Sequence, residues 1–243
     1  MTPADLSNAL LYGIPFVLYT SMYQGFDSIL GRRARPCPEK EFGGAESEDG
    51  PAADAALHVA VAKLPEQFRA ASDLVRKRYA WRGYDVDAMT TPSSREITFL
   101  VDSGKTTLGT LTLGFDGPKG LCAEASYGDV IDRFRSSGYR VCELTRLALA
   151  ESVDTKTVLS SLFSLAHAVG RTLHDVSHVF IEVNPRHVSF YSRVLGFVVE
   201  AGGKVCERVH APSTLLQVEI EALERRLGLI DLAALMQPLA EAA

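Results

Sequence analysis

A glutamate and an arginine lie three residues apart, as Glu143 and Arg146, in the apolar segment from Val141 to Leu149. A glutamate can accept a proton from an amine, and an arginine can bind a carboxylate or orient a neighbouring glutamate. Residues three apart on a regular strand face opposite sides, so both side chains reach one site only if a β-bulge shifts the strand. The alternative is an exposed glutamate and an arginine that pairs elsewhere.

Polar and aromatic residues also follow the next predicted strand, in the stretch Asn-Pro-Arg-His-Val-Ser-Phe-Tyr from Asn184 to Tyr191. A tyrosine phenol can act as an acid, although Tyr191 could equally be a core residue of a short helix. Asn184 could simply cap that helix, and His187 could contact a ligand or lie in solvent. The segment therefore predicts either a site beside a strand end or an ordinary junction.

Positive charge is concentrated on the helix predicted after Pro65 and on its exit. The whole chain carries 25 Lys and Arg against 30 Asp and Glu, a formal charge of −5, which argues against a protein that grips nucleic acid over its whole face. The basic residues of this segment are Arg69, Arg76, Lys77, Arg78 and Arg82. They predict either a docking surface for an acidic partner or a solvated helix face.

The elements that must position these residues alternate between strands and helices. Apolar spacing predicts strands at 57–62, 97–102, 107–114, 141–149, 177–184, 197–200 and 213–220. It predicts helices at 65–81, 130–135, 158–173 and 186–194, and from 222 onward with a break at Gly228. This order indicates a mixed α/β fold around one central sheet.

The domain organisation follows from a change in composition between residues 31 and 56, where Arg, Pro, Gly and acidic residues leave no apolar face. We predict an apolar N-terminal extension (1–30), a flexible linker (31–56), one domain (57–220) and a C-terminal helical segment (221–243). The apolar run 9–19 is too short to span a bilayer and could dock as a helix, cover a site or contact a membrane surface.

Composition excludes several classes of protein. Hydrophobic residues make up 47% of the 243 residues and charged residues 23%, as in ordinary globular proteins. The four cysteines form no C-x-x-C pair and have no histidine at ligand spacing, so neither a zinc site nor a disulfide framework is predicted. We expect reduced thiols, no bound metal and a cytoplasmic protein.

Three stretches resemble a known superfamily. The element order, together with N-P-R-H-V-S-F-Y-S-R-V-L-G-F at 184–197, resembles the GNAT-type N-acyltransferases over residues 57–220. The stretches C-E-L-T-R-L-A-L at 142–149 and R-K-R-Y-A-W-R-G-Y at 76–84 resemble the branch of long-chain N-acyl amino acid synthases, which is related to acyl-homoserine lactone synthases. The resemblance implies a GNAT-like sheet flanked by helices.

The resemblance also implies roles for individual residues. Glu143, Arg146 and Tyr191 are then the base, the acceptor-binding or orienting arginine and the general acid, and Arg76, Asn184, His187 and Phe190 contact substrates. Arg69, Lys77, Arg78 and Arg82 would dock an acidic acyl carrier protein. Arg76 also matches the helix arginine of related branches, so ordering the acceptor and docking the carrier are competing roles for that residue.

One departure from common acetyltransferases concerns the donor. Those enzymes hold the coenzyme A pyrophosphate with a glycine-rich loop at a helix N-terminus. The corresponding junction here, 151–161, contains no glycine and carries Glu151 and Asp154, which would repel a pyrophosphate. The resemblance implies that the donor is the acyl-phosphopantetheine of an acyl carrier protein, with no other cofactor bound, and the missing loop fits that donor.

These residues predict an enzyme that transfers a fatty acyl chain from a carrier protein to the α-amine of an amino acid. One alternative is a signal synthase related to the acyl-homoserine lactone synthases. Another is a catalytically degenerate GNAT fold that only binds, which the missing phosphate loop would favour. The presence of Glu143, Arg146 and Tyr191 favours the enzyme.

Overall fold

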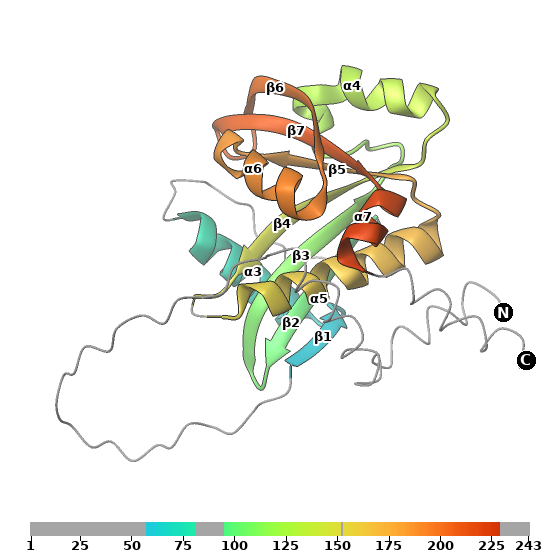
Figure 1. The fold of residues 1–243 in the computed structure, drawn as a ribbon. Coiled ribbons are helices and arrows are strands. Elements are labelled where there is room, and N and C mark those ends of the chain that lie inside the picture. Colours follow the sequence, from blue (N-terminus) through green and yellow to red (C-terminus); the bar gives the residue numbers. More distant parts are fainter. Residues whose placement is uncertain (1–56, 81–94, 152, 229–243) are drawn as a thin grey trace, which may run out of the picture.

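A computed structural model describes residues 57–80, 95–151 and 153–228 of the chain (Figure 1). These residues form the mixed sheet with helices on both faces that the sequence predicts. The strands are β1 (Leu57–Val61), β2 (Glu96–Ser103), β3 (Thr106–Phe115), β4 (Val141–Leu149), β5 (His178–Val183), β6 (Val198–Cys206) and β7 (Ala211–Glu219). The helical elements are α3 (Pro65–Ala80), α4 (Glu124–Ser136), α5 (Thr155–Ala168), η1 (Val169–Leu173), η2 (Pro185–His187), α6 (Val188–Phe190), η3 (Tyr191–Leu195) and α7 (Ile220–Leu227).

The sheet opens in its middle. Its strand order is β1-β2-β3-β4-β5-β7-β6, and all neighbours are antiparallel except β4 and β5, which are parallel. These two strands form only three residue pairs, the last between Glu143 and Phe180. Beyond that pair β4 runs on to Leu149 and β5 to Val183 with no ladder between them. We call the opening between these two stretches the β4–β5 slot.

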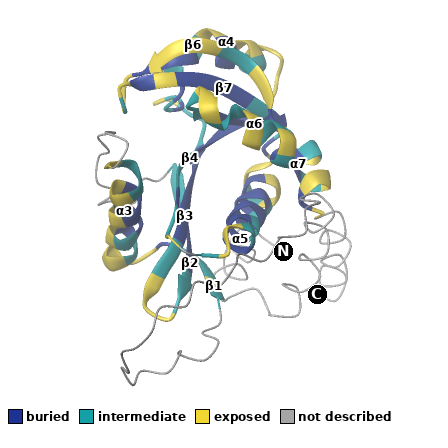
Figure 2. Ribbon diagram, turned by 60° about the vertical axis from the view of Figure 1, so that its left-hand side comes forward, coloured by how far each residue is buried: buried dark blue, intermediate teal, exposed yellow. Residues whose placement is uncertain are grey.

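Helices α3 and α5 cover opposite faces of the sheet (Figures 1 and 2). Helix α3 buries one stripe, including Phe68, Ala71, Leu74 and Val75, whose spacing of three or four residues matches the helical repeat. Helix α5 is buried over most of its surface, as its nearly continuous apolar sequence predicts. The slot therefore lies between two helical layers that hold it in place.

A β-bulge interrupts β4, as expected for the arginine to reach the glutamate's face. The register with β3 shifts between Thr112↔Thr145 and Thr110↔Ala148, and Arg146 adopts a positive φ of 54°. At the bulge β4 has one residue more than the facing stretch of β3. The extra residue places the Arg146 side chain on the opposite face of the sheet from the one it would have on a regular strand. The bulge that a shared face for Glu143 and Arg146 requires is therefore present.

Most other predicted elements are confirmed, with several extensions, such as the strand expected at 197–200, which runs on to Cys206 as β6. The helix expected at 130–135 begins earlier, at Glu124, and helix α5 begins at Thr155 instead of residue 158. Helix α7 ends at Gly228, whose φ of 68° suits the glycine expected there. The predicted extension, linker and last part of the C-terminal segment lie outside the described residues. Among the residues that are described, no helix has the length and apolar character needed to cross a membrane.

Candidate active site

The β4–β5 slot contains a cavity of about 540 Å³. This volume is within the range of pockets that enclose small-molecule ligands. Its walls come from the facing stretches of β4 and β5, the end of α3, helix α5, the segment 184–191 and the turn between β6 and β7. Elements that are distant in sequence therefore meet at one opening of the sheet.

The cavity has an apolar side and a polar side. Because neighbouring residues of a strand point to opposite faces, the β-strand edges contribute different side chains on each side of the sheet. The apolar residues belong to the core that α5 covers and include Leu111, Leu144, Leu159, Phe163 and Ile181. The polar residues on the other strand face and on the β6–β7 turn include Thr145, Arg146, Glu182, Arg208 and Ser213.

Arg146 lines this cavity and is held by an acidic residue across the sheet. Its Nη1 donates to Oε1 of Glu96 on β2 at 2.9 Å. The ladders place Glu96 opposite Gly114 and Gly114 opposite Glu143, so these three residues share one face. The bulge thus brings Arg146 to the face that carries Glu143, although only Arg146 lines the cavity. The ion pair with Glu96 orients the guanidinium along the wall of the cavity.

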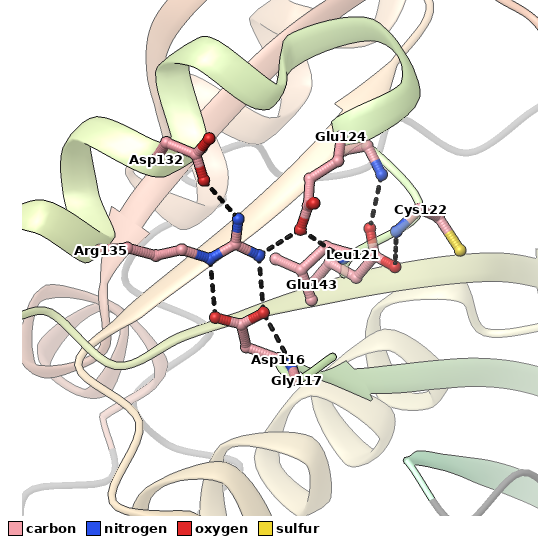
Figure 3. A network of polar contacts seen from close by, with 9 residues as sticks. Asp116, Gly117, Leu121, Cys122, Glu124, Asp132, Arg135 and Glu143 are labelled. Atoms are coloured by element: carbon pink, nitrogen blue, oxygen red, sulfur yellow. Dashed lines mark hydrogen bonds and ion pairs between the residues drawn. The ribbon is translucent and has the colours of Figure 1, made fainter. Parts of the chain in front are cut away.

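Glu143 is buried, with 4% of its surface exposed, and its carboxylate points to the turn before α4 (Figure 3). Oε1 accepts the backbone N–H of Cys122 at 2.6 Å and Oε2 accepts that of Ala123 at 3.1 Å. Gly114 leaves room for this arrangement, because a Cβ there would lie 3.2 Å from Cγ of Glu143. Glu143 does not line the cavity that the described residues form. Its role as base stays a prediction, whereas its contacts tie α4 to β4.

Arg135 fastens the same helix from its other end (Figure 3). Its guanidinium forms a bidentate pair with Asp116, at 2.8 and 2.6 Å, and also contacts Glu124 and Asp132. These carboxylates and Glu143 together fix the start of α4 over the ends of β3 and β4. The network is structural, since none of its four members lines the cavity.

Tyr191 lines the cavity on the α5 side. Burial raises the pKa of its phenol above the ordinary value, and the nearby Tyr79 of α3 raises it further. Tyr79 itself donates to the carbonyl oxygen of Leu147 on β4 at 3.2 Å. Tyr191 therefore keeps its proton at neutral pH and can donate a hydrogen bond into the cavity.

The other residues predicted between 184 and 191 also meet at the cavity. Asn184, His187 and Phe190 all contribute to its wall. Asn184 accepts the backbone N–H of Arg186 at 3.3 Å and so caps the turn, which was its alternative role. Nε2 of His187 lies 3.2 Å from Nε of Arg186. The helical turns after β5 therefore place this whole motif beside the slot.

The basic residues of α3 do not share one environment. Arg69 and Lys77 are exposed, and Arg76 is exposed and pairs with Asp73 at 2.8 Å. Arg78 instead lines the cavity and pairs with Glu151 at 2.8 Å. Arg82 lies outside the described residues. Arg76, expected to contact the acceptor, is not part of the cavity wall, and Arg78, expected on the docking surface, is.

Sequence reasoning missed a carboxylate on β5. Glu182 lines the cavity, and only 4% of its side chain is exposed. Its Oε2 lies 3.6 Å from Nη2 of Arg208 in the β6–β7 turn. The thiol of Cys206 is a weak hydrogen-bond donor to Glu182, and its pKa is raised by burial and then by the charge of Glu182. The signal was a single Glu in the apolar strand H-V-F-I-E-V, which invites a search for its partner.

The N-terminus of α5 is occupied by its own cap. The Asp154 carboxylate accepts the backbone N–H of Lys156 at 3.2 Å and that of Thr157 at 3.5 Å, and the Thr157 hydroxyl also contacts it. An aspartate at this position satisfies the free N–H groups of the first turn. The same groups are then not offered to a pyrophosphate, which carries the same sign of charge.

Comparison with known proteins decides the family. Residues 70–219, more than half of the chain, match the family described as N-acyl amino acid synthase FeeM. The chain belongs to this FeeM family. It is an acyltransferase, and the β4–β5 slot is its candidate active site. A comparison with curated proteins found no match.

Solved structures agree with the fold of the FeeM family. FeeM itself, an N-acyl amino acid synthase from uncultured soil microbes, aligns with a TM-score of 0.64 at 24% identity over 70% of this chain and 94% of its own. A putative acyl-CoA N-acyltransferase from Klebsiella pneumoniae aligns at 0.47 and 12% identity, over 68% and 99% of the chains. The AHL synthase LasI aligns at 0.47 and 13%, over 71% and 95%. The expected GNAT-like fold is confirmed.

Proposed function

We propose that this acyltransferase moves a long fatty acyl chain from an acyl carrier protein to the α-amine of an amino acid. The observation that carries the proposal is the two-sided cavity in the β4–β5 slot. Leu144, Phe163 and Ile181 offer an apolar surface for an acyl chain, and Arg146, Glu182 and Arg208 offer charges for a zwitterion. A thioester bound in the slot would therefore have its acyl chain on the apolar side and its carbonyl carbon close to the amine on the polar side.

The slot also suits the arm that would carry the acyl group. A pantetheine contains two amides, and beyond Glu143 no ladder joins the facing edges of β4 and β5, so backbone N–H and C=O groups there can pair with those amides. The Asp154 cap at α5 disfavours a nucleotide pyrophosphate, as described above. We therefore propose a donor with a pantetheine arm and no nucleotide, and Tyr191 as the group that meets the leaving thiolate.

A donor comparison tests this proposal directly. We expect the purified enzyme to use a long-chain acyl carrier protein thioester with a higher kcat/KM than the same acyl group on coenzyme A. Steady-state assays with free amino acids and both thioesters measure the ratio, and mass spectrometry of the product gives acyl chain and acceptor together. Equal efficiency on the two donors would contradict the carrier-protein assignment, and no N-acyl amino acid with any donor would contradict the function.

The exposed basic residues of α3 provide a second test. Arg69→Glu with Lys77→Glu is expected to slow reaction with the carrier-linked donor and to spare a short acyl-pantetheine thioester, because only the carrier must dock. The effect should weaken with salt, since exposed charges are screened beyond about 10 Å at 0.1 M ionic strength. Rates at several salt concentrations measure both effects.

This pair leaves out Arg76 and Arg78, because Arg76 already pairs with Asp73 and Arg78 lines the cavity. Lys105→Glu with Lys119→Glu, two exposed lysines outside α3, is the matched control, because it reverses the same number of charges. Equal losses with both donors would show that these residues serve the fold or the active site. Unchanged rates with both donors would show an ordinary solvated face.

A further inference from the structure

Glu182 is a buried carboxylate whose partners within the described part of the chain are weak. Its side chain is 4% exposed, neither carboxylate oxygen has an N–H or O–H hydrogen-bond donor there, and the neighbouring thiol of Cys206 is only a weak donor. Arg208 approaches to 3.6 Å, which is within ion-pair range and too long for a hydrogen bond. Buried polar groups are normally hydrogen-bonded, so such an exception calls for a functional reason.

The surroundings of Glu182 show what would satisfy it. The residue lies in the cavity wall and not in the packed core, so a ligand can reach the carboxylate. Burial of Arg208 lowers its pKa, yet nearby groups that include Glu143 and Glu182 raise it above its ordinary value, so the guanidinium remains charged. The side chain of Arg208 is 41% exposed and lines the cavity. A cation and an anion therefore stand side by side at the polar side of the slot.

The spacing of this pair matches one class of substrate. In an α-amino acid one carbon atom separates the ammonium from the carboxylate. A carboxylate and a guanidinium 3.6 Å apart can bind these two groups at the same time, the carboxylate the ammonium and the guanidinium the substrate carboxylate. Each then forms a charge-assisted hydrogen bond, which is stronger than their contact with each other. An amine without a carboxylate would satisfy only Glu182.

We propose that Glu182 and Arg208 bind the zwitterionic acceptor, Glu182 the ammonium and Arg208 the carboxylate, and that Glu182 then takes the proton that frees the amine. This inference rests on the proposed function and names its acceptor site. Glu182 is thus a catalytic residue, whereas Glu143, whose oxygens hold two backbone N–H groups, is a positioning residue. Arg146, fixed by Glu96, lines the same polar side next to the acceptor.

These groups account for all three protons of the substrate ammonium. Glu182 takes one proton from the ammonium, and the neutral amine attacks the thioester carbonyl carbon, forming the C–N bond. The C–S bond breaks as the tetrahedral intermediate collapses, and the nitrogen loses a second proton to the leaving sulfur, with the Tyr191 phenol hydrogen-bonded to that sulfur. One proton stays on the amide nitrogen, and Glu182 returns its own to solvent.

The test is Glu182→Gln, which keeps the side chain's shape and removes its charge. We expect kcat/KM for the amino acid to fall about 10²–10⁴-fold, the range of general-base catalysis. With hydroxylamine, whose amine is neutral at assay pH, the variant should retain most of the wild-type rate. Its melting temperature should change little, because Arg208, which loses the 3.6 Å contact, is 41% exposed and can be solvated. Glu207→Gln, an exposed neighbour of the same turn, is the control and should match the wild type.

A second variant keeps the inference testable if Glu182→Gln does not fold. Arg208→Gln alters a partly exposed turn residue and should raise KM for the amino acid at least tenfold while kcat changes less. Wild-type kcat/KM in Glu182→Gln, an equal loss with hydroxylamine, or an unchanged KM in Arg208→Gln would each overturn the acceptor site. Those results would leave the proposed function intact, provided that the wild-type enzyme makes N-acyl amino acids.

Discussion

The Glu143→Gln variant is expected to unfold with a free energy about 2 kcal/mol below that of the wild type. Each carboxylate oxygen of Glu143 accepts a backbone N–H, at Cys122 and Ala123. Hydrogen bonds to a charged group contribute about 1.5–3 kcal/mol, and an amide can replace only one of the two acceptors, turning its NH₂ toward the other N–H. Urea unfolding followed by circular dichroism measures the difference.

The control for this variant is Glu219→Gln, at the exposed end of β7, which should leave stability unchanged. Turnover well below the melting temperature should fall less in Glu143→Gln than in Glu182→Gln. The E-x-x-R resemblance makes the opposite prediction. A stable Glu143→Gln enzyme with turnover reduced about 10²–10⁴-fold would return the role of base to Glu143.

The Tyr191→Phe variant should keep the fold and lose about 10–100-fold in kcat. The phenol would otherwise donate a hydrogen bond to the developing thiolate, and such a charge-assisted bond is worth about 1.5–3 kcal/mol. Burial raises the pKa of Tyr191, so the phenol is a weak acid that stabilises the thiolate by hydrogen bonding. Single-turnover rates with the purified variant measure the loss.

Leaving-group chemistry and pH give this prediction its controls. An aryl thiolate is a better leaving group than an alkyl thiolate and gains less from a hydrogen bond. With an aryl thioester the difference in kcat between Tyr191→Phe and the wild type should therefore be smaller. Because burial disfavours the phenolate, wild-type kcat should not fall from loss of this proton until the pH exceeds the ordinary phenol value of 10.0. Tyr139→Phe, an exposed tyrosine away from the cavity, should behave as the wild type. An equal loss with aryl and alkyl thioesters would remove Tyr191 from this step.

Local features of the sequence determined much of the architecture. Alternating and helical spacing predicted the strands and helices, and the bulge expected between Glu143 and Arg146 is present. The glycine-free junction before α5 is capped by Asp154, whose carboxylate accepts the backbone N–H groups two and three residues later. A cap over so short a separation can be read from a sequence. The motif from Asn184 to Tyr191 reaches the cavity because it follows directly on β5.

Only the tertiary structure decided which carboxylate lines the cavity. Strand alternation gives the face on which Glu143 and Glu182 lie, but not what covers that face. The turn at Cys122 and Ala123 covers Glu143, and the slot exposes Glu182 to the cavity with Arg208 arriving from a distant turn. These placements depend on where β4 and β5 stop pairing and on how β7 joins β5. Such long-range pairings follow from the packing of the whole sheet, because no local spacing of residues specifies them.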